Sequence, residues 1–219
     1  MSEQNTGVPT SEAGSRANIF YGLARALEPP RNWAIDLPYL LARSIGTSAD
    51  PAGVLGMQLS DQIHELIADR EPAAVEHARL FLGPFEILVP PWGSFYLEDE
   101  PRLMGPTSNY AGRAFADSGL APGGKLKDAP DHVTHELEFM YFLAFNEATT
   151  GDLIWRDRQV LFWREHLGRW LPMFAESLEH AAVLPFYQTL AATIAEVCRF
   201  ENESWEAIPA GEDLKTGIT

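Results

Sequence analysis

Helical periodicity is the feature of this sequence that most limits its fold. Where apolar residues recur regularly, they recur about every 3.6 residues, and no window alternates as a strand would. Residues 131–146 are apolar on almost every side, so we expect them to form a helix at the centre of the core. The pattern predicts an all-α fold, a single-domain helical bundle of about eight or nine helices.

The expected helices are bounded by glycine, proline and capping residues. They lie at 19–27, 37–45, 53–67, 70–82, 107–118, 131–146, 155–167, 170–181 and 185–200. One helical domain is expected at 17–200, between a disordered N-terminal segment at 1–16 and an acidic, disordered tail at 201–219. Residues 120–129 are rich in glycine and proline, which predicts a flexible connector.

The charge of the chain restricts its partners. The formal net charge is −15, from 31 acidic and 16 basic residues, and this disfavours nucleic acid and anionic membrane surfaces and favours a basic partner. The polar N-terminus has no apolar signal core, and no stretch of about 18 apolar residues lacks a charge, so we expect no stable membrane insertion and a cytoplasmic location. The single cysteine, Cys198, cannot form an intramolecular disulfide, which suits a reducing compartment.

A proline-rich aromatic segment follows Gly83. Pro90 and Pro91 hold the backbone extended, so we predict that this segment is not helical. A rigid segment that displays aromatic side chains loses little entropy on binding, which favours recognition of a peptide or protein over catalysis. The aromatic side chains are Phe85, Trp92, Phe95 and Tyr96. For Trp92, a core role and a binding role both remain open, whereas Trp155, Trp163 and Trp170 recur at helical spacing and are expected in the core.

Acid–base chemistry has one candidate location. His132, His135 and Glu136 share a helix face, as metal ligands on a helix must. The residue order is not that of a zinc protease, so we predict no metal and expect Asp131 and His132 to form a polar grip at an exposed helix start, with Asp131 orienting the imidazole. Residues 119–125 have phosphate-loop spacing without the following Ser or Thr, and no nucleophile motif is present. We therefore predict no cofactor and no catalytic residue.

Two separated motifs resemble the TorD/DmsD-like cytoplasmic chaperones of molybdoenzymes of the dimethyl sulfoxide reductase family. They are His77-Ala78-Arg79-Leu80-Phe81 with Gly83-Pro84 and Pro90-Pro91-Trp92-Gly93-Ser94, and Asp128-Ala129-Pro130-Asp131-His132. His77 stands where the family has an aromatic residue, and in the second motif the first acid is shortened and the proline is moved by one place. The resemblance extends with weaker support over about residues 19–200.

The resemblance implies a dedicated chaperone rather than an enzyme. Such a protein binds the twin-arginine signal peptide and the apo catalytic subunit of a molybdopterin oxidoreductase, assists cofactor insertion and delays export until maturation. A leader with a basic start and an apolar stretch is complementary to an acidic protein with an apolar groove. The implied client-binding residues are His77, Leu80, Phe81, Phe85, Pro91, Trp92, Ser94, Tyr96, Asp131 and His132.

Several alternatives remain open at this point. Within the family, the chain could assemble a non-exported nitrate-reductase-type subunit, and both a monomer and a domain-swapped dimer are compatible with the resemblance. Outside the family, the alternatives are a metal-dependent hydrolase built on the face of His132, His135 and Glu136, and a helical domain that binds a small apolar molecule.

Overall fold

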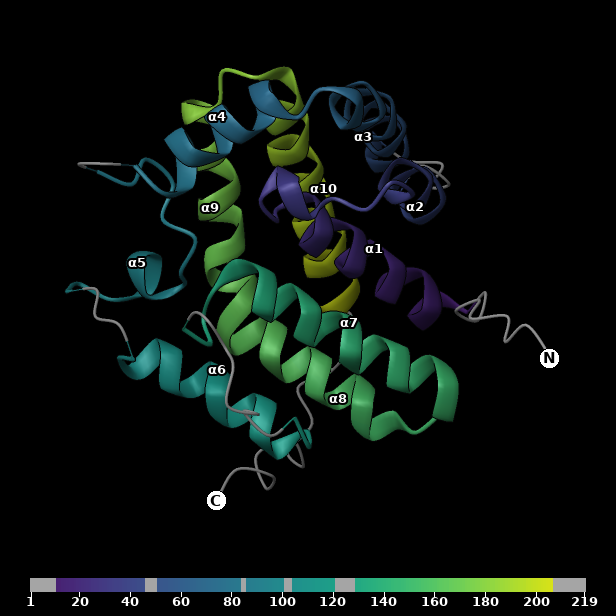
Figure 1. The fold of residues 1–219 in the computed structure, drawn as a ribbon. Coiled ribbons are helices and arrows are strands. Elements are labelled where there is room, and N and C mark those ends of the chain that lie inside the picture. Colours follow the sequence, from purple (N-terminus) through teal and green to yellow (C-terminus); the bar gives the residue numbers. More distant parts are fainter. Residues whose placement is uncertain (1–10, 46–50, 84–85, 101–103, 121–128, 207–219) are drawn as a thin grey trace.

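The computed structural model describes residues 11–45, 51–83, 86–100, 104–120 and 129–206 (Figure 1). Within these residues the regular structure is helical, without a strand, so the all-α prediction is confirmed. The α-helices are α1 (Glu12–Ala26), α2 (Leu37–Ser44), α3 (Pro51–Ala68), α4 (Glu71–Phe81), α5 (Ser94–Leu97), α6 (Pro106–Asp117), α7 (Val133–Thr150), α8 (Leu153–Phe162), α9 (Gly168–Ala181) and α10 (Pro185–Glu206). Among these described helices, none has both the length and the apolar character needed to cross a lipid bilayer.

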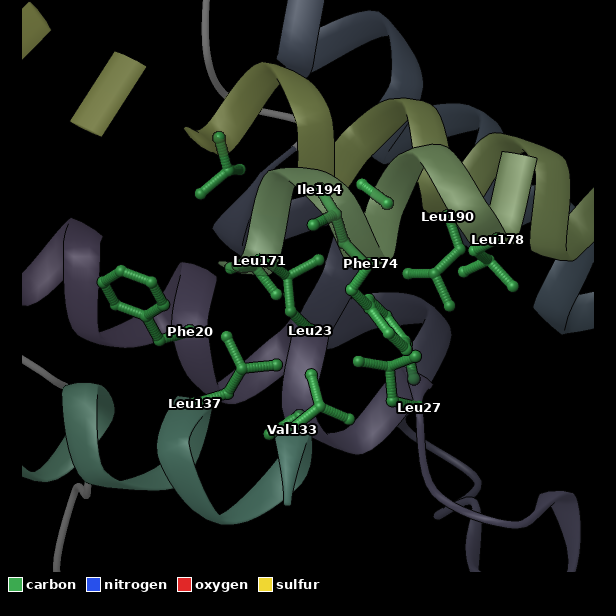
Figure 2. Packing of buried hydrophobic residues seen from close by; sticks show 14 of the residues in the cluster. Phe20, Leu23, Leu27, Val133, Leu137, Leu171, Phe174, Leu178, Leu190 and Ile194 are labelled. Atoms are coloured by element: carbon green, nitrogen blue, oxygen red, sulfur yellow. The ribbon is translucent and has the colours of Figure 1, made fainter. Parts of the chain in front are cut away.

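The core lies where α1, α7, α9 and α10 meet. Figure 2 shows labelled side chains of these four helices and of Leu27, the residue after α1, converging in one cluster: Phe20, Leu23, Leu27, Val133, Leu137, Leu171, Phe174, Leu178, Leu190 and Ile194. Burial of each large apolar side chain stabilises the fold by roughly 1.5–3 kcal/mol. Helix α7 packs against α1 and α8, which confirms the central position expected for residues 131–146. Trp163 and Trp170 are buried as expected, whereas Trp155 is only half-buried.

The helical domain extends beyond both expected boundaries. Helix α1 starts at Glu12, because the Ser11 side chain accepts the Gly14 N–H at 3.1 Å and caps it. At the other end, α10 continues to Glu206. The structure thus places residues 12–16 and 201–206 in helices, where the sequence predicted disordered segments. Residues 1–10 and 207–219, and most of the expected connector at 121–128, lie outside the described residues.

One helical turn lies in the segment predicted to be non-helical. Helix α5 begins at Ser94, where the Gly93 N–H donates to the Asp131 carbonyl and the Ser94 N–H donates to Asp131 Oδ2, both at 2.9 Å. These tertiary bonds satisfy amides that a helix start leaves without an intrahelical partner. The prediction is wrong here because the stabilising residue is distant in sequence.

The helix expected at 155–167 also changes character before its end. Helix α8 stops at Phe162 and the chain continues as a π-helical turn, Trp163–Leu167, before α9 begins at Gly168. A Cβ atom at Gly168 would lie 2.6 Å from Trp163 Nε1, so this junction requires glycine. His166 lies in this wider turn and is 3% exposed.

Candidate functional site

A pocket of about 450 Å³ opens between the end of α1, α4, the turn at Pro91 and the start of α7. This volume is typical of sites that hold a small ligand or a short stretch of peptide. Five of the predicted site residues line it: His77, Phe81, Pro91, Trp92 and His132. The pattern analysis missed a further wall, formed by Leu27, Glu28, Pro29, Arg31 and Asn32 after α1, and it missed Thr134. The adjacent prolines Pro29 and Pro30 were the sequence signal that could have identified this wall, since they form a second rigid turn, and a rigid turn can shape a groove.

Backbone hydrogen bonds join the two sequence motifs at this pocket. The Val133 N–H donates to the Pro91 carbonyl at 2.8 Å, and the Gly93 N–H donates to the Asp131 carbonyl at 2.9 Å. Between these bonds, Trp92 and His132 form an isolated antiparallel bridge, and their rings meet edge to face with centroids 5.8 Å apart. Residues that are far apart in the sequence thus form one wall of the pocket.

The imidazole of His132 is fixed by the helix that it caps. Its Nδ1 accepts the Thr134 N–H at 3.3 Å and lies 2.8 Å from Thr134 Oγ1. With Nδ1 accepting from the amide, a neutral ring carries its proton on Nε2, which makes Nε2 a hydrogen-bond donor. The expected exposed helix start is corrected, because Asp131 is 1% exposed and its Oδ2 accepts the Ser94 N–H, whereas its role in orienting the ring stays a prediction.

His77 contributes a neutral polar group to the opposite wall. Burial lowers the pKa of His77 to about 4, although the hydrogen bond to the Leu27 carbonyl acts in the other direction. The ring packs edge to face on Phe81, with centroids 4.9 Å apart. His77 therefore occupies the place of the aromatic residue in the related motif while remaining uncharged at neutral pH.

Acidification is expected to destabilise the wild-type protein more than a His77→Phe variant between pH 6.5 and pH 4. The pKa of His77 is about 4 in the folded protein against 6.5 for an ordinary histidine, so in this window the unfolded state binds the proton first. Stability then falls as pH falls through this range and is independent of this group above pH 6.5. Urea unfolding of both proteins across the range measures the difference, and parallel pH profiles would contradict it.

The other predicted site residues do not line the pocket. Leu80 is 0% exposed and packs in the core, so its expected contact with a client is corrected. Ser94 is also buried, and its backbone amide is held by Asp131. Tyr96 is half-buried and stacks on Trp170, and burial raises its pKa to about 12. Phe85 lies outside the described residues.

The helix face considered for a metal is divided between two environments. His132 and His135 face the pocket with ring centroids 5.4 Å apart, whereas Glu136 is 0% exposed and points into the core. There its Oε1 lies 2.6 Å from His166 Nε2, its Oε2 accepts from Trp170 Nε1 at 3.0 Å, and burial raises its pKa. In the part of the chain that the structure describes, no three His, Cys, Asp or Glu side chains are arranged to hold a metal ion. The arrangement required for the hydrolase alternative is thus not formed.

Comparison with known proteins gives consistent relatives. A profile of the nitrate reductase delta subunit family matches residues 52–176, a range that contains both motifs. The Tat proofreading chaperone DmsD of Salmonella typhi is 30% identical over 129 residues, which cover 59% of this chain and 58% of that protein. The chaperone protein TorD of Vibrio parahaemolyticus is 26% identical over 152 residues, covering 66% of this chain and 70% of TorD. The chain thus matches less than two thirds of the length of DmsD.

A solved structure supports the fold independently of these sequences. The crystal structure of a candidate redox enzyme maturation protein from Archaeoglobus fulgidus superposes with a TM-score of 0.54 at 22% sequence identity. The superposition covers 90% of this chain and 99% of the archaeal chain. At this identity the likeness establishes a shared all-helical architecture.

Proposed function

Because the chain belongs to the nitrate reductase delta subunit family, we propose that it is a dedicated chaperone for a molybdopterin oxidoreductase. It binds the twin-arginine signal peptide and the apo catalytic subunit, assists cofactor insertion and delays export until the subunit is mature. The relatives named DmsD and TorD are chaperones by name, and DmsD is described as a Tat proofreading chaperone. The observation that carries the proposal is that residues of both motifs line the same pocket.

The pocket suits the apolar part of a leader. Phe81, Pro91 and Trp92 provide apolar walls, and the histidines offer hydrogen bonds to the polar backbone of an extended peptide. We assign direct contacts to His77, Phe81, Pro91, Trp92 and His132. The wall that carries Trp92 is supported from the interior by Ser94, Tyr96 and Asp131. Asp131 accepts the N–H groups of both Gly93 and Ser94 and so holds this wall in place.

The basic part of the leader is attracted by the overall charge of the protein. Glu28, the acidic residue among those lining the pocket, is 2.5 Å from Arg25 Nη1 and is already part of an ion pair. The formal net charge of −15 therefore acts at longer range, by raising the local concentration of a cationic peptide and its rate of association.

Titration of the protein with its client leader tests the proposal directly. The leader is expected to bind, and its affinity to fall as salt is raised from 50 to about 300 mM, since salt screens the attraction between the two charges. A leader with both arginines replaced by glutamine is the control and should bind more weakly. Equal affinity for the two peptides would remove the arginines from recognition, and no binding of either would remove the leader.

A second function within the family is favoured by the name of the matching profile. The profile describes the delta subunit of nitrate reductase, so the client could be a nitrate-reductase-type subunit that is not exported. Pull-down with an apo catalytic subunit from which the leader has been deleted separates the two functions. Loss of binding on deletion supports leader recognition, and undiminished binding supports assembly of a subunit through its mature part.

A further inference from the structure

The wall of the pocket that carries Trp92 rests on one buried indole. A Cβ atom added at Gly93 would lie 2.9 Å from Trp170 Nε1 and 3.0 Å from its Cε2, so the backbone touches the ring. Three residues later, the Tyr96 ring stacks on Trp170 with centroids 5.7 Å apart and an interplanar angle of 20°. Trp170 therefore sets how deeply residues 93–96 can sit.

Trp170 is itself held by a polar pair in the core. Its Nε1 donates to Glu136 Oε2 at 3.0 Å, and Glu136 Oε1 lies 2.6 Å from His166 Nε2. The exposed fractions of Glu136, His166 and Trp170 are 0%, 3% and 0%, so solvent does not screen these bonds. The Tyr110 ring of α6 stacks on His166 with centroids 5.0 Å apart and limits its rotation.

The same pair also reaches the pocket through α7. Glu136 lies one helical turn after His132, and the Glu136 N–H donates to the His132 carbonyl at 3.1 Å. His132 lines the pocket and is bridged to Trp92. Glu136 is thus connected to the wall by two routes, through the indole beneath Gly93 and through the first turn of α7.

Burying a carboxylate costs desolvation free energy, and apolar side chains of similar volume often stabilise a fold as well or better. Its advantage is directional bonding, which fixes one arrangement of its neighbours. We infer that Glu136, His166 and Trp170 form a positioning support that sets the location of the Trp92 wall, so that client affinity depends on three residues that do not line the pocket. The inference rests on the proposed function only for the identity of the ligand.

Substitution at Glu136 tests the support, with Glu201 as a matched control. Glu136→Leu should lower affinity for the client leader by about tenfold, since it leaves Trp170 and His166 without their shared partner. Glu136→Gln can accept from Trp170 with its amide oxygen and donate an amide N–H to His166 Nε2 when the imidazole proton is on Nδ1, and it should restore affinity to within about twofold of wild type. Glu201 is a second buried carboxylate, paired with Arg16 between α1 and α10, so Glu201→Leu should lower stability without changing affinity. Equal losses of affinity in Glu136→Leu and Glu201→Leu would overturn the inference.

If Glu136→Leu does not fold, a substitution on the pocket side of Trp170 tests the same inference. Gly93→Ala places a methyl group against Trp170 and should weaken leader binding by about tenfold through displacement of the wall. Gly112→Ala is its control, because there the nearest atom to an added Cβ is 3.5 Å away, an ordinary contact. Wild-type affinity in Gly93→Ala would overturn the inference.

Amide exchange separates failure of the support from failure of the proposed function, because it needs no client. In Gly93→Ala and Glu136→Leu, the amides of Gly93, Ser94 and Val133, which bond across the two motifs, should exchange faster, while the interior amides of α10 keep their protection. Unchanged exchange at these amides would overturn the inference even if the wild type binds the leader. Faster exchange in a protein that binds no leader would uphold the support and reject the proposed ligand.

Discussion

Trp92→Ala is expected to lower affinity for the client leader by about 2–4 kcal/mol, a larger loss than the same variant suffers in its free energy of unfolding. Trp92 is half-buried, lines the pocket, and contacts Phe95 and His132 through its ring. Aromatic side chains at the centre of a recognition surface commonly dominate its binding energy. Titration calorimetry with the leader and urea unfolding measure the two losses separately.

Two further variants give this experiment its controls. Trp155→Ala truncates another half-buried tryptophan, one that packs on Phe142 away from the pocket, and should leave affinity unchanged. Leu80→Ala removes a fully buried side chain from the same motif as His77 and should lower the free energy of unfolding by about 2–5 kcal/mol. Its folded fraction should still bind the leader. If Trp92→Ala instead loses more stability than affinity, Trp92 is a core residue and the pocket does not recognise the leader through it.

Helical periodicity was sufficient for most of the fold. The helices around the core have large apolar residues at regular spacing, and their positions could be predicted to within a few residues. The start of α1 was missed because its buried positions there are Ala13, Gly14 and Ala17, which carry little hydrophobic signal. The end of α10 was missed for a related reason, since buried Glu201 reads as an exposed acidic residue until its partner is known.

The part of the candidate site that is formed by residues of the two local sequence motifs was predictable. The motifs identified His77, Phe81, Pro91, Trp92 and His132, all of which line one pocket. The direction in which a helical residue points was not predictable from spacing alone. His132 and Glu136 share a face by periodicity, yet one lines the pocket and the other enters the core, because His132 is the N-cap of α7 and its extended backbone (φ −69°, ψ 136°) takes its side chain off the helical repeat. The turn at α5 was similarly hidden, since its anchor Asp131 lies 37 residues away.

Arg16→Met is expected to lower the free energy of unfolding by about 3–5 kcal/mol, because it leaves the Glu201 carboxylate buried without its partner. Arg16 Nε lies 3.1 Å and 3.0 Å from the two carboxylate oxygens of Glu201, and the guanidinium stacks 4.3 Å from the centre of the Trp205 ring. The pair ties the first helix to the last. Arg199→Met is the matched control, since Arg199 pairs with two carboxylates of the same helix α10 at the exposed surface and should contribute little.

The destabilisation caused by Arg16→Met should also depend on pH and on whether Glu201 is present. Burial raises the pKa of Glu201 and Arg16 lowers it, so loss of Arg16 raises the pKa further and lets the carboxyl group stay protonated in the folded state at low pH. Between its ordinary value of 4.5 and the raised value, the folded state then binds more protons than the unfolded state, and stability falls as pH rises. The loss of stability in Arg16→Met should therefore be larger at pH 8 than at pH 5.

Adding Glu201→Leu to Arg16→Met removes the buried charge and should recover most of the lost stability at both pH values. No recovery would mean that Arg16 stabilises the fold through its packing on Trp205 rather than through the ion pair.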